Sequence, residues 1–253
     1  MKLPERHRKI LEILKSNGNI AVNELSEMLK VSSVTIRKDL GILEDQQLLF
    51  RSHGGALPLE PYIANRHIQE KIKVFPEEKK RIGAKATELL IPGDAIIIGS
   101  GTTVQAFAQC INPKSSLTVV TSAMNVATAL VHHPQIEIFQ LGGFVRHTSN
   151  SVVGNYAESI LTNFSCSKLF LGVDGIDLRY GFSTTNAMEA QINRAMLKAA
   201  QETIILADSS KFGRRGFGKI CDLGSVSQII TDTGVSHKTI QELEKHGILV
   251  TTV

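Results

Sequence analysis

From Pro76 to the end of the sequence, short apolar segments alternate with segments of helical periodicity. Six of these apolar segments have the length and composition of buried strands: Ala95–Ile98, Thr118–Thr121, Glu137–Gln140, Leu169–Val173, Ile204–Ala207 and Gln228–Thr231. Most of the segments between them have a helical pattern, beginning with Glu77–Leu90. Strands that alternate with helices form a largely parallel sheet with helices on both faces. The pattern therefore predicts one α/β domain over residues 76–253.

The first 57 residues have a different pattern, which predicts three short helices and a β-hairpin. Apolar residues recur at helical spacing in each helix, and in the third they are Ile36, Leu40 and Leu43. A strand, a tight turn and a returning strand follow over residues 48–57. Two helices joined by a short turn have the size of a helix-turn-helix, and the hairpin adds a wing. We expect a winged helix-turn-helix over residues 1–57 and a linker with two prolines over residues 58–75.

The composition is that of an ordinary soluble protein, and its charge is nearly balanced. Hydrophobic residues make up 42% and the net charge is +4, so bulk charge argues only weakly for a nucleic-acid partner. We find no apolar signal core and no segment long enough to span a bilayer, and we expect a cytoplasmic protein without membrane contact. The scattered Cys110, Cys166 and Cys221 fit reduced thiols, and His132-His133 has no further ligand at metal spacing, so neither a metal nor a cofactor is expected.

The third predicted helix has polar and basic residues away from its apolar anchor. Ser32 or Ser33 suits its N-cap, and its N-terminal half is the part that meets base edges in a major groove. Arg37 suits a guanine or a phosphate, and the hairpin reaches the DNA backbone or a minor groove. The candidate DNA-contacting residues are Ser33, Thr35, Arg37, Lys38, Arg51 and His53. On periodicity alone, a plain helical bundle with solvated charges explains this segment equally well.

Longer motifs in the same segment resemble the DeoR family of bacterial regulators. They are the run Val31–Leu40, the pair Leu43-Glu44 and the turn Arg51–Ala56, which contains His-Gly-Gly-Ala. The resemblance implies a winged helix that binds double-stranded operator DNA. It favours this interpretation over the plain bundle.

A turn of small residues, Gly99–Thr103, follows the first predicted strand of the α/β domain and leads into a helix. Glycine lets the backbone approach a ligand closely, while N–H groups and hydroxyls at a helix start bind anions. A nucleotide-binding P-loop is excluded because no Gly-Lys-Ser/Thr follows. By itself, the segment is equally well explained as an ordinary strand-to-helix turn.

Other polar segments follow other predicted strands, at the sheet edge where open α/β folds bind ligands. Arg146 and Lys211 are candidate cations for a phosphate, although Arg146 and Asp177 are singly better explained as capping or solvated turn residues. Carboxylate and amide side chains offer groups for sugar hydroxyls. The candidate ligand-binding residues are Ser100, Gly101, Thr102, Thr103, Asn125, Gly142, Gly143, Arg146, Asp174, Glu189 and Lys211.

This half also resembles the DeoR family, so the resemblance covers nearly the whole chain. It implies a sensor domain similar to ribose-5-phosphate isomerase that binds a phosphorylated sugar effector. The runs Phe170–Asp177, Gly181–Thr184, Glu189-Ala190, Asn193-Arg194 and Asp208–Phe212 look most like the N-acetylgalactosamine (Aga-type) repressors, which implies an amino-sugar or ketose phosphate. Two positions depart from the family: Gly99 stands where Asp is usual, and Ser122 where Asn is common. Both bear on ligand contacts rather than on the fold.

The alternative class is a sugar-phosphate isomerase with a fused DNA-binding domain. Isomerisation needs a carboxylate base and a cation that stabilises an enediolate, and Asp174 and Lys211 lie in segments similar to the isomerase. However, the isomerase has a Lys before a glycine run, and the corresponding residues 178–182 of this chain contain no Lys. The catalytic Glu of the isomerase corresponds to a position near Asn193, and an Asn cannot act as a base. Glu189 lies one turn away. We therefore expect no enzyme.

These patterns and the resemblance predict a transcriptional regulator, with the family implying a repressor of a sugar-catabolism operon that a phosphorylated sugar releases. A single winged helix is a small reader of DNA, so we expect a homo-oligomer, either a dimer or a tetramer.

Overall fold

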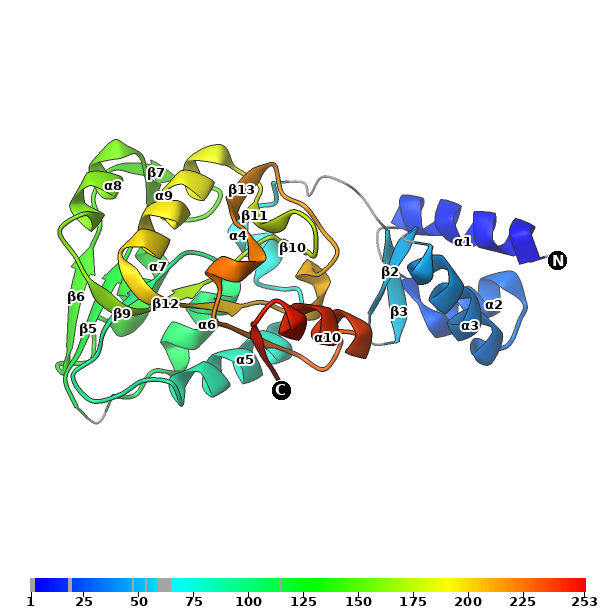
Figure 1. Ribbon diagram of the computed structural model, residues 1–253, viewed down its shortest axis with the longest axis horizontal. Coiled ribbons are helices and arrows are strands. Elements are labelled where there is room, and N and C mark those ends of the chain that lie inside the picture. Colours follow the sequence, from blue (N-terminus) through cyan, green and yellow to red (C-terminus); the bar gives the residue numbers. More distant parts are fainter. Residues whose placement is uncertain (1–2, 18–19, 47, 53, 59–64, 114) are drawn as a thin grey trace.

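The computed structural model describes residues 3–17, 20–46, 48–52, 54–58, 65–113 and 115–253. A small N-terminal unit of helices and a short sheet precedes a larger α/β unit (Figure 1). Among the described residues, no helix is long and apolar enough to cross a membrane.

The N-terminal unit has the winged helix-turn-helix architecture expected from the sequence. Its elements are α1 (Leu3–Asn17), β1 (Ile20–Ala21), α2 (Val22–Leu29), α3 (Ser33–Asp45), β2 (Leu49–Ser52) and β3 (Gly55–Pro58). β3 pairs antiparallel with both β1 and β2, and the hairpin β2–β3 forms the wing. The core contains Ile10, Leu14, Leu25, Ile36 and Leu40, because these apolar positions of the three helices face one another.

A buried polar contact fixes α3 to α1. Asp39 is 1% exposed, and its Oδ1 accepts a hydrogen bond of 2.9 Å from Arg6 and lies 3.2 Å from His7 Nε2. Burial alone would raise the pKa of Asp39, but the hydrogen bonds from Arg6 and His7 outweigh it and hold that pKa below its usual range. Asp39 therefore holds α3 against α1 through buried contacts.

The larger unit is built on a seven-stranded parallel sheet. Its strands are β4 (Ala95–Ile98), β5 (Leu117–Thr121), β6 (Ile136–Gln140), β9 (Cys166–Leu171), β12 (Ala200–Leu206), β14 (Gln228–Thr231) and β15 (Leu249–Thr252). Their order is β15-β14-β12-β9-β4-β5-β6, and every neighbouring pair is parallel. This confirms the predicted α/β fold class.

Helices cover both faces of this sheet. They are α5 (Pro76–Thr87), α6 (Thr102–Cys110), α7 (Met124–Leu130), α8 (Asn155–Leu161), α9 (Ala187–Lys198) and α10 (His237–Lys245). Successive residues of a strand point to opposite faces, so Ile96 and Ile98 of β4 pack in a core cluster that includes side chains of α5, α6 and α7. Ile97 packs in the other cluster, with side chains of α8, α9 and α10.

Smaller elements complete the unit outside the main sheet. They are α4 (Ile68–Lys71), the hairpin of β7 (Phe144–Arg146) and β8 (Ser151–Val153), a small sheet of β10 (Gly175–Asp177), β11 (Gly181–Thr184) and β13 (Gly218–Cys221), and 3-10 turns at Ser209–Lys211 and Leu223–Ser225. The six predicted strands are all present, with small shifts; the strand expected at Leu169–Val173, for example, is Cys166–Leu171. The sequence analysis did not predict β15, an edge strand whose residues are half-buried or exposed.

Candidate functional site

The sheet changes its direction of growth at β4. β5 and β6 are added on one side of this strand, whereas β9, β12, β14 and β15 extend the sheet on the other side. The loops after β4 and β9 therefore diverge at the carboxyl edge, which is where open α/β sheets leave a crevice for ligands. A pocket lies at this point, and residues of both loops, including Ser100 and Gly172, line it.

One end of the pocket is formed by the turn Ser100–Thr103 at the start of α6. Gly101 is the N-cap and has a φ of 123°, a conformation that favours glycine. Across the turn, a Cβ on Gly172 would lie 2.9 Å from the carbonyl oxygen of Ser100, so only glycine allows the two loops to approach this closely. The first N–H groups of α6 and the hydroxyls of Thr102 and Thr103 thus gather at one place, which suits an anion.

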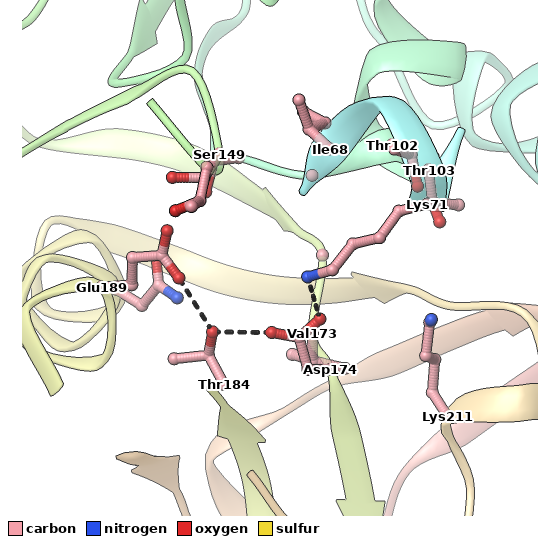
Figure 2. A pocket seen from close by; sticks show the side chains of 15 residues that line it. Ile68, Lys71, Thr102, Thr103, Ser149, Val173, Asp174, Thr184, Glu189 and Lys211 are labelled. Carbon is pink, nitrogen blue, oxygen red and sulfur yellow. Dashed lines mark hydrogen bonds and ion pairs between the residues drawn. The ribbon is translucent and has the colours of Figure 1, made fainter. Parts of the chain in front are cut away.

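Two lysines from distant parts of the chain line the same pocket. Lys71 of α4 extends to Asp174, with 2.7 Å between Nζ and Oδ1, and Lys211 follows β12, with its Nζ 3.9 Å from Asp208. Figure 2 shows Lys71 and Lys211 on two sides of Asp174. Burial would raise the pKa of Asp174, but the charges of Lys71 and Lys211 hold it below the usual range. The pocket therefore contains an ionised carboxylate between two cations.

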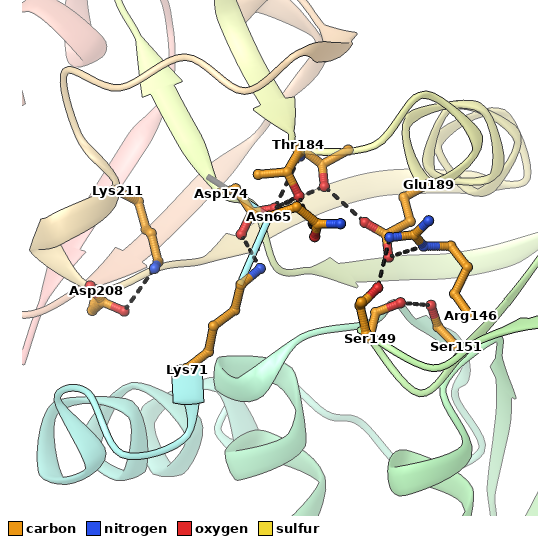
Figure 3. Close-up of polar contacts among 12 residues, drawn as sticks. Asn65, Lys71, Arg146, Ser149, Ser151, Asp174, Thr184, Glu189, Asp208 and Lys211 are labelled. Atoms are coloured by element: carbon orange, nitrogen blue, oxygen red, sulfur yellow. Dashed lines mark hydrogen bonds and ion pairs between the residues drawn. The ribbon is translucent and has the colours of Figure 1, made fainter. Parts of the chain in front are cut away.

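The opposite wall of the pocket is a chain of hydrogen bonds that runs from Asp174 to Arg146. The Thr184 hydroxyl lies between the two carboxylates, 2.9 Å from an oxygen of Asp174 and 3.2 Å from an oxygen of Glu189, and its one proton can be donated to either of them. The other oxygen of Glu189 lies 3.2 Å from Arg146 Nε, and Arg146 also donates to the Thr148 hydroxyl (Figure 3). These contacts fix both carboxylates in place.

The segment that carries Lys71 is fastened to this wall. The backbone N–H of Ile68 donates to the carbonyl of Thr148 at 2.8 Å, and the Thr185 hydroxyl donates to Asn65. Lys79 of α5, only 3% exposed, donates to the carbonyls of Lys71 (2.6 Å) and Val74. Burial lowers the pKa of Lys79 to about 8. Part of the predicted linker is therefore a structural component of the pocket.

The structure brings most of the predicted ligand-binding residues together. Lining the pocket are Ser100, Gly101, Thr102, Thr103, Asp174, Glu189 and Lys211. Arg146 lies behind Glu189 instead of at the surface of the pocket. Asn125 donates to Gln105 at 2.6 Å and lines a different hollow, and Gly142 and Gly143 are not among the lining residues.

Several residues that line the pocket were not predicted. They include Ile68, Lys71, Thr148, Ser149, Thr184 and Asn193. Lys71 lies in residues 62–75, which have no clear periodicity, and Thr148 and Ser149 lie in a hairpin loop that no pattern indicates. Asn193 is one turn after Glu189 on α9, so the helical spacing of the two residues was the signal available.

The third helix of the N-terminal unit presents its first turns to solvent. Ser32 is the N-cap, and its hydroxyl accepts from the backbone N–H of Thr35 at 3.2 Å. Arg37, Lys38 and Arg51 are exposed, while Ser33 and Thr35 are half-buried. Val34 is 71% exposed, which is unusual for a branched apolar residue and suits contact with a thymine methyl group. His53 lies outside the described residues.

A winged helix-turn-helix joined to an α/β unit with a built pocket is the architecture of a ligand-responsive DNA-binding regulator. Comparison with known proteins identifies the family of regulators. A DeoR-like helix-turn-helix domain matches residues 6–61, and a DeoR C-terminal sensor domain matches residues 74–233. The chain belongs to the DeoR family of transcriptional regulators.

Similar proteins cover nearly the full length of the chain. A protein proposed to be a repressor of the aga operon in Escherichia coli O157:H7 is 38% identical over 98% of this chain and 93% of its own length. The glycerol-3-phosphate regulon repressor of Escherichia coli K12 is 31% identical over 98% of both chains. The lactose phosphotransferase system repressor of Staphylococcus epidermidis is 33% identical over 90% of this chain and 91% of its own. These relatives are named as regulators, and the chain is a regulator rather than an enzyme.

Solved structures resemble the α/β unit more distantly. Ribose 5-phosphate isomerase A from Methanocaldococcus jannaschii matches 54% of each chain with a TM-score of 0.41 and 15% identity. The eIF2B beta subunit from Chaetomium thermophilum matches 70% of this chain and 56% of its own, with a TM-score of 0.45 and 14% identity.

Proposed function

We propose that the protein is a repressor of a sugar-catabolism operon and that a phosphorylated sugar releases it from its operator. Residues 1–57 bind the operator, residues 58–75 link the two parts, and residues 76–253 bind the effector. The observation that carries the proposal is the pocket at the switch point, where the start of α6 and two lysines converge on the same chain as a winged helix. Related repressors are named for the aga operon, the glycerol-3-phosphate regulon and a lactose transport system.

The phosphate of the effector binds to Ser100, Gly101, Thr102 and Thr103, with Lys71 and Lys211 as its cations. Backbone N–H groups at a helix start and lysine ammonium groups are the donors that proteins use for phosphate. Asp174 and Glu189 accept hydrogen bonds from the sugar, which we expect to be an amino-sugar or ketose phosphate. Asn125, Gly142 and Gly143 are not among the residues that line this pocket, and Arg146 acts by orienting Glu189.

The DNA contacts are made by the exposed face of α3 and by the wing. Ser33, Thr35, Arg37 and Lys38 approach the major groove, Arg51 and His53 approach the backbone, and Val34 adds an apolar contact. A single winged helix contacts few base pairs, so the protein acts as a homo-oligomer, a dimer or a tetramer, on a repeated site.

Two measurements test the two ends of this proposal. Arg37→Ala should abolish footprint protection of DNA upstream of the gene, whereas Arg8→Ala, an exposed change on α1, should leave it intact. Thermal unfolding across a panel of hexose, amino-hexose and ketose phosphates should show stabilisation of the wild type, because a ligand that binds only the native state raises its stability. Thr102→Val should reduce that stabilisation and the exposed control Thr162→Val should not. Absence of stabilisation by every sugar phosphate would refute the sensor function.

A further inference from the structure

Asn193 is buried in the wall of the pocket with an acceptor atom that has no donor. Its side chain is 3% exposed, and its Oδ1 has no hydrogen-bond partner in the part of the chain that the structure describes. The same residue lines the pocket. Roughly 90% or more of buried polar groups are paired, and an unpaired one costs about 1–3 kcal/mol. An unpaired acceptor at a pocket therefore points to a donor that a ligand supplies.

The neighbouring acceptors in this wall are already bonded. Glu189, one helical turn before Asn193, uses one carboxylate oxygen for Arg146 and the other for Thr184. Asp174 is bonded to Lys71 and to the backbone N–H of Thr185. Asn193 thus differs from both carboxylates: each of their oxygens has at least one partner within the protein, whereas its Oδ1 has none.

The position of Asn193 relative to the anion site limits which part of a ligand it meets. Figure 2 shows Glu189 on the side of the pocket away from Thr102 and Thr103, and Asn193 follows Glu189 by one turn of α9. A ligand whose phosphate is bound at the start of α6 therefore directs its sugar toward Asn193.

We propose that Asn193 determines which sugar is recognised, because its Oδ1 accepts a hydrogen bond from one hydroxyl or amino group of the effector. This inference rests on the proposed binding of a sugar phosphate. A neutral amide is not basic enough to take a proton from the sugar, so this contact recognises the sugar without catalysing a reaction. A site built to bond one such group discriminates against the analogue that lacks it, because the buried acceptor is then left unpaired.

The test is calorimetric titration of the full-length protein and of Asn193→Leu, with Gln191→Leu on the exposed side of the same helix as the control. The probes are inorganic phosphate, the tightest-binding member of the sugar phosphate panel, and its analogues that each lack one hydroxyl or amino group. Asn193→Leu should weaken the parent sugar phosphate about fivefold to tenfold, as expected for one lost hydrogen bond, and leave inorganic phosphate unchanged. One analogue should bind the wild type and Asn193→Leu equally.

The outcomes separate the inference from the proposed function. Failure of the whole panel to bind the wild type would overturn the sensor function and this inference together. Binding of the parent that Asn193→Leu leaves unchanged, or an equal loss for every analogue, would overturn the role of Asn193 alone. Without ligand, Asn193→Leu should unfold at the wild-type temperature or above it, because it removes an unpaired buried acceptor; a lower temperature would show that the amide is bonded within the protein and would also count against the inference.

Discussion

Asp39 illustrates how one residue of α3 serves the fold while its neighbours serve the surface. Arg37 and Lys38 are exposed, but Asp39 points inward to Arg6 and His7. We expect Asp39→Asn to destabilise the N-terminal unit by about 1–3 kcal/mol, since it removes charge-assisted hydrogen bonds from a buried site. Thermal unfolding followed by circular dichroism measures this loss, and Glu27→Gln, an exposed change on α2, should cost much less.

The pH dependence of the same unfolding checks the cause. The pKa of Asp39 is lower in the folded protein than in the unfolded chain, so the folded state binds fewer protons there and Asp39 contributes its stability above the unfolded pKa of about 4. That contribution disappears as the pH falls through the lower, folded pKa. The difference in unfolding temperature between the wild type and Asp39→Asn should therefore shrink as the pH falls from 7 toward 3. A constant difference would contradict the ionic origin of the contact.

Single residues also show where prediction from the sequence stops. The turn Ser100–Thr103 was predictable because glycines and hydroxyls follow a strand there, and local chemistry of this kind is visible in one segment. Lys71 was not predictable, because its function depends on a partner, Asp174, that lies more than a hundred residues away. The unpaired oxygen of Asn193 depends likewise on three-dimensional packing, although its spacing from Glu189 is visible in the sequence.

At the scale of elements, α5 fixes the segment that contains α4. From a buried position, Lys79 donates to the carbonyls of Lys71 and Val74. Lys79→Met should release this segment, because Met fills a volume similar to that of the lysine methylenes but donates no hydrogen bond. Hydrogen exchange measured by mass spectrometry should become faster in residues 68–74 and stay unchanged in β4. Lys80→Met, an exposed change on the same helix, is the control. Unchanged exchange at residues 68–74 would show that the contacts from Ile68 and Asn65 suffice to hold α4.

Strands and helices were predictable to the extent that burial determines them. Apart from the edge strand β6, the predicted strands are buried on both faces over most of their predicted length, and such strands form continuous apolar runs. β7, β8, β10, β11 and β13 have three or four residues each and pair antiparallel outside the main sheet, so neither their length nor an apolar run distinguishes them from loops. These short elements provide much of the pocket wall, which is why the predicted site lacked Thr184, Thr148 and Ser149.

At the scale of the whole molecule, the contacts between the winged helix and the α/β unit bear on how the two sites communicate. Asp45 of α3 lies 2.9 Å from Lys238 of α10, but both side chains are 70% exposed, and such pairs contribute little to stability. The linker has a stronger attachment, because Lys71 and Ile68 belong to the pocket region itself. We therefore expect the effector to act on the DNA-binding unit through the linker.

This route predicts a reciprocal change of affinity that depends on Lys71. Lys71 is bonded to Asp174, and we expect a bound phosphate to attract it toward α6. Two states that differ in a contact with the effector meet the requirement for coupling. If the effector weakens operator binding by a given factor, typically about 5- to 150-fold, the operator must weaken effector binding by the same factor. Titrating each ligand with and without the other measures both factors. At saturating effector, Lys71→Met should bring the factor close to one, whereas Lys73→Met, exposed in the same segment, should retain it. Full coupling in Lys71→Met would place the route of communication elsewhere, for instance across the contact between α3 and α10.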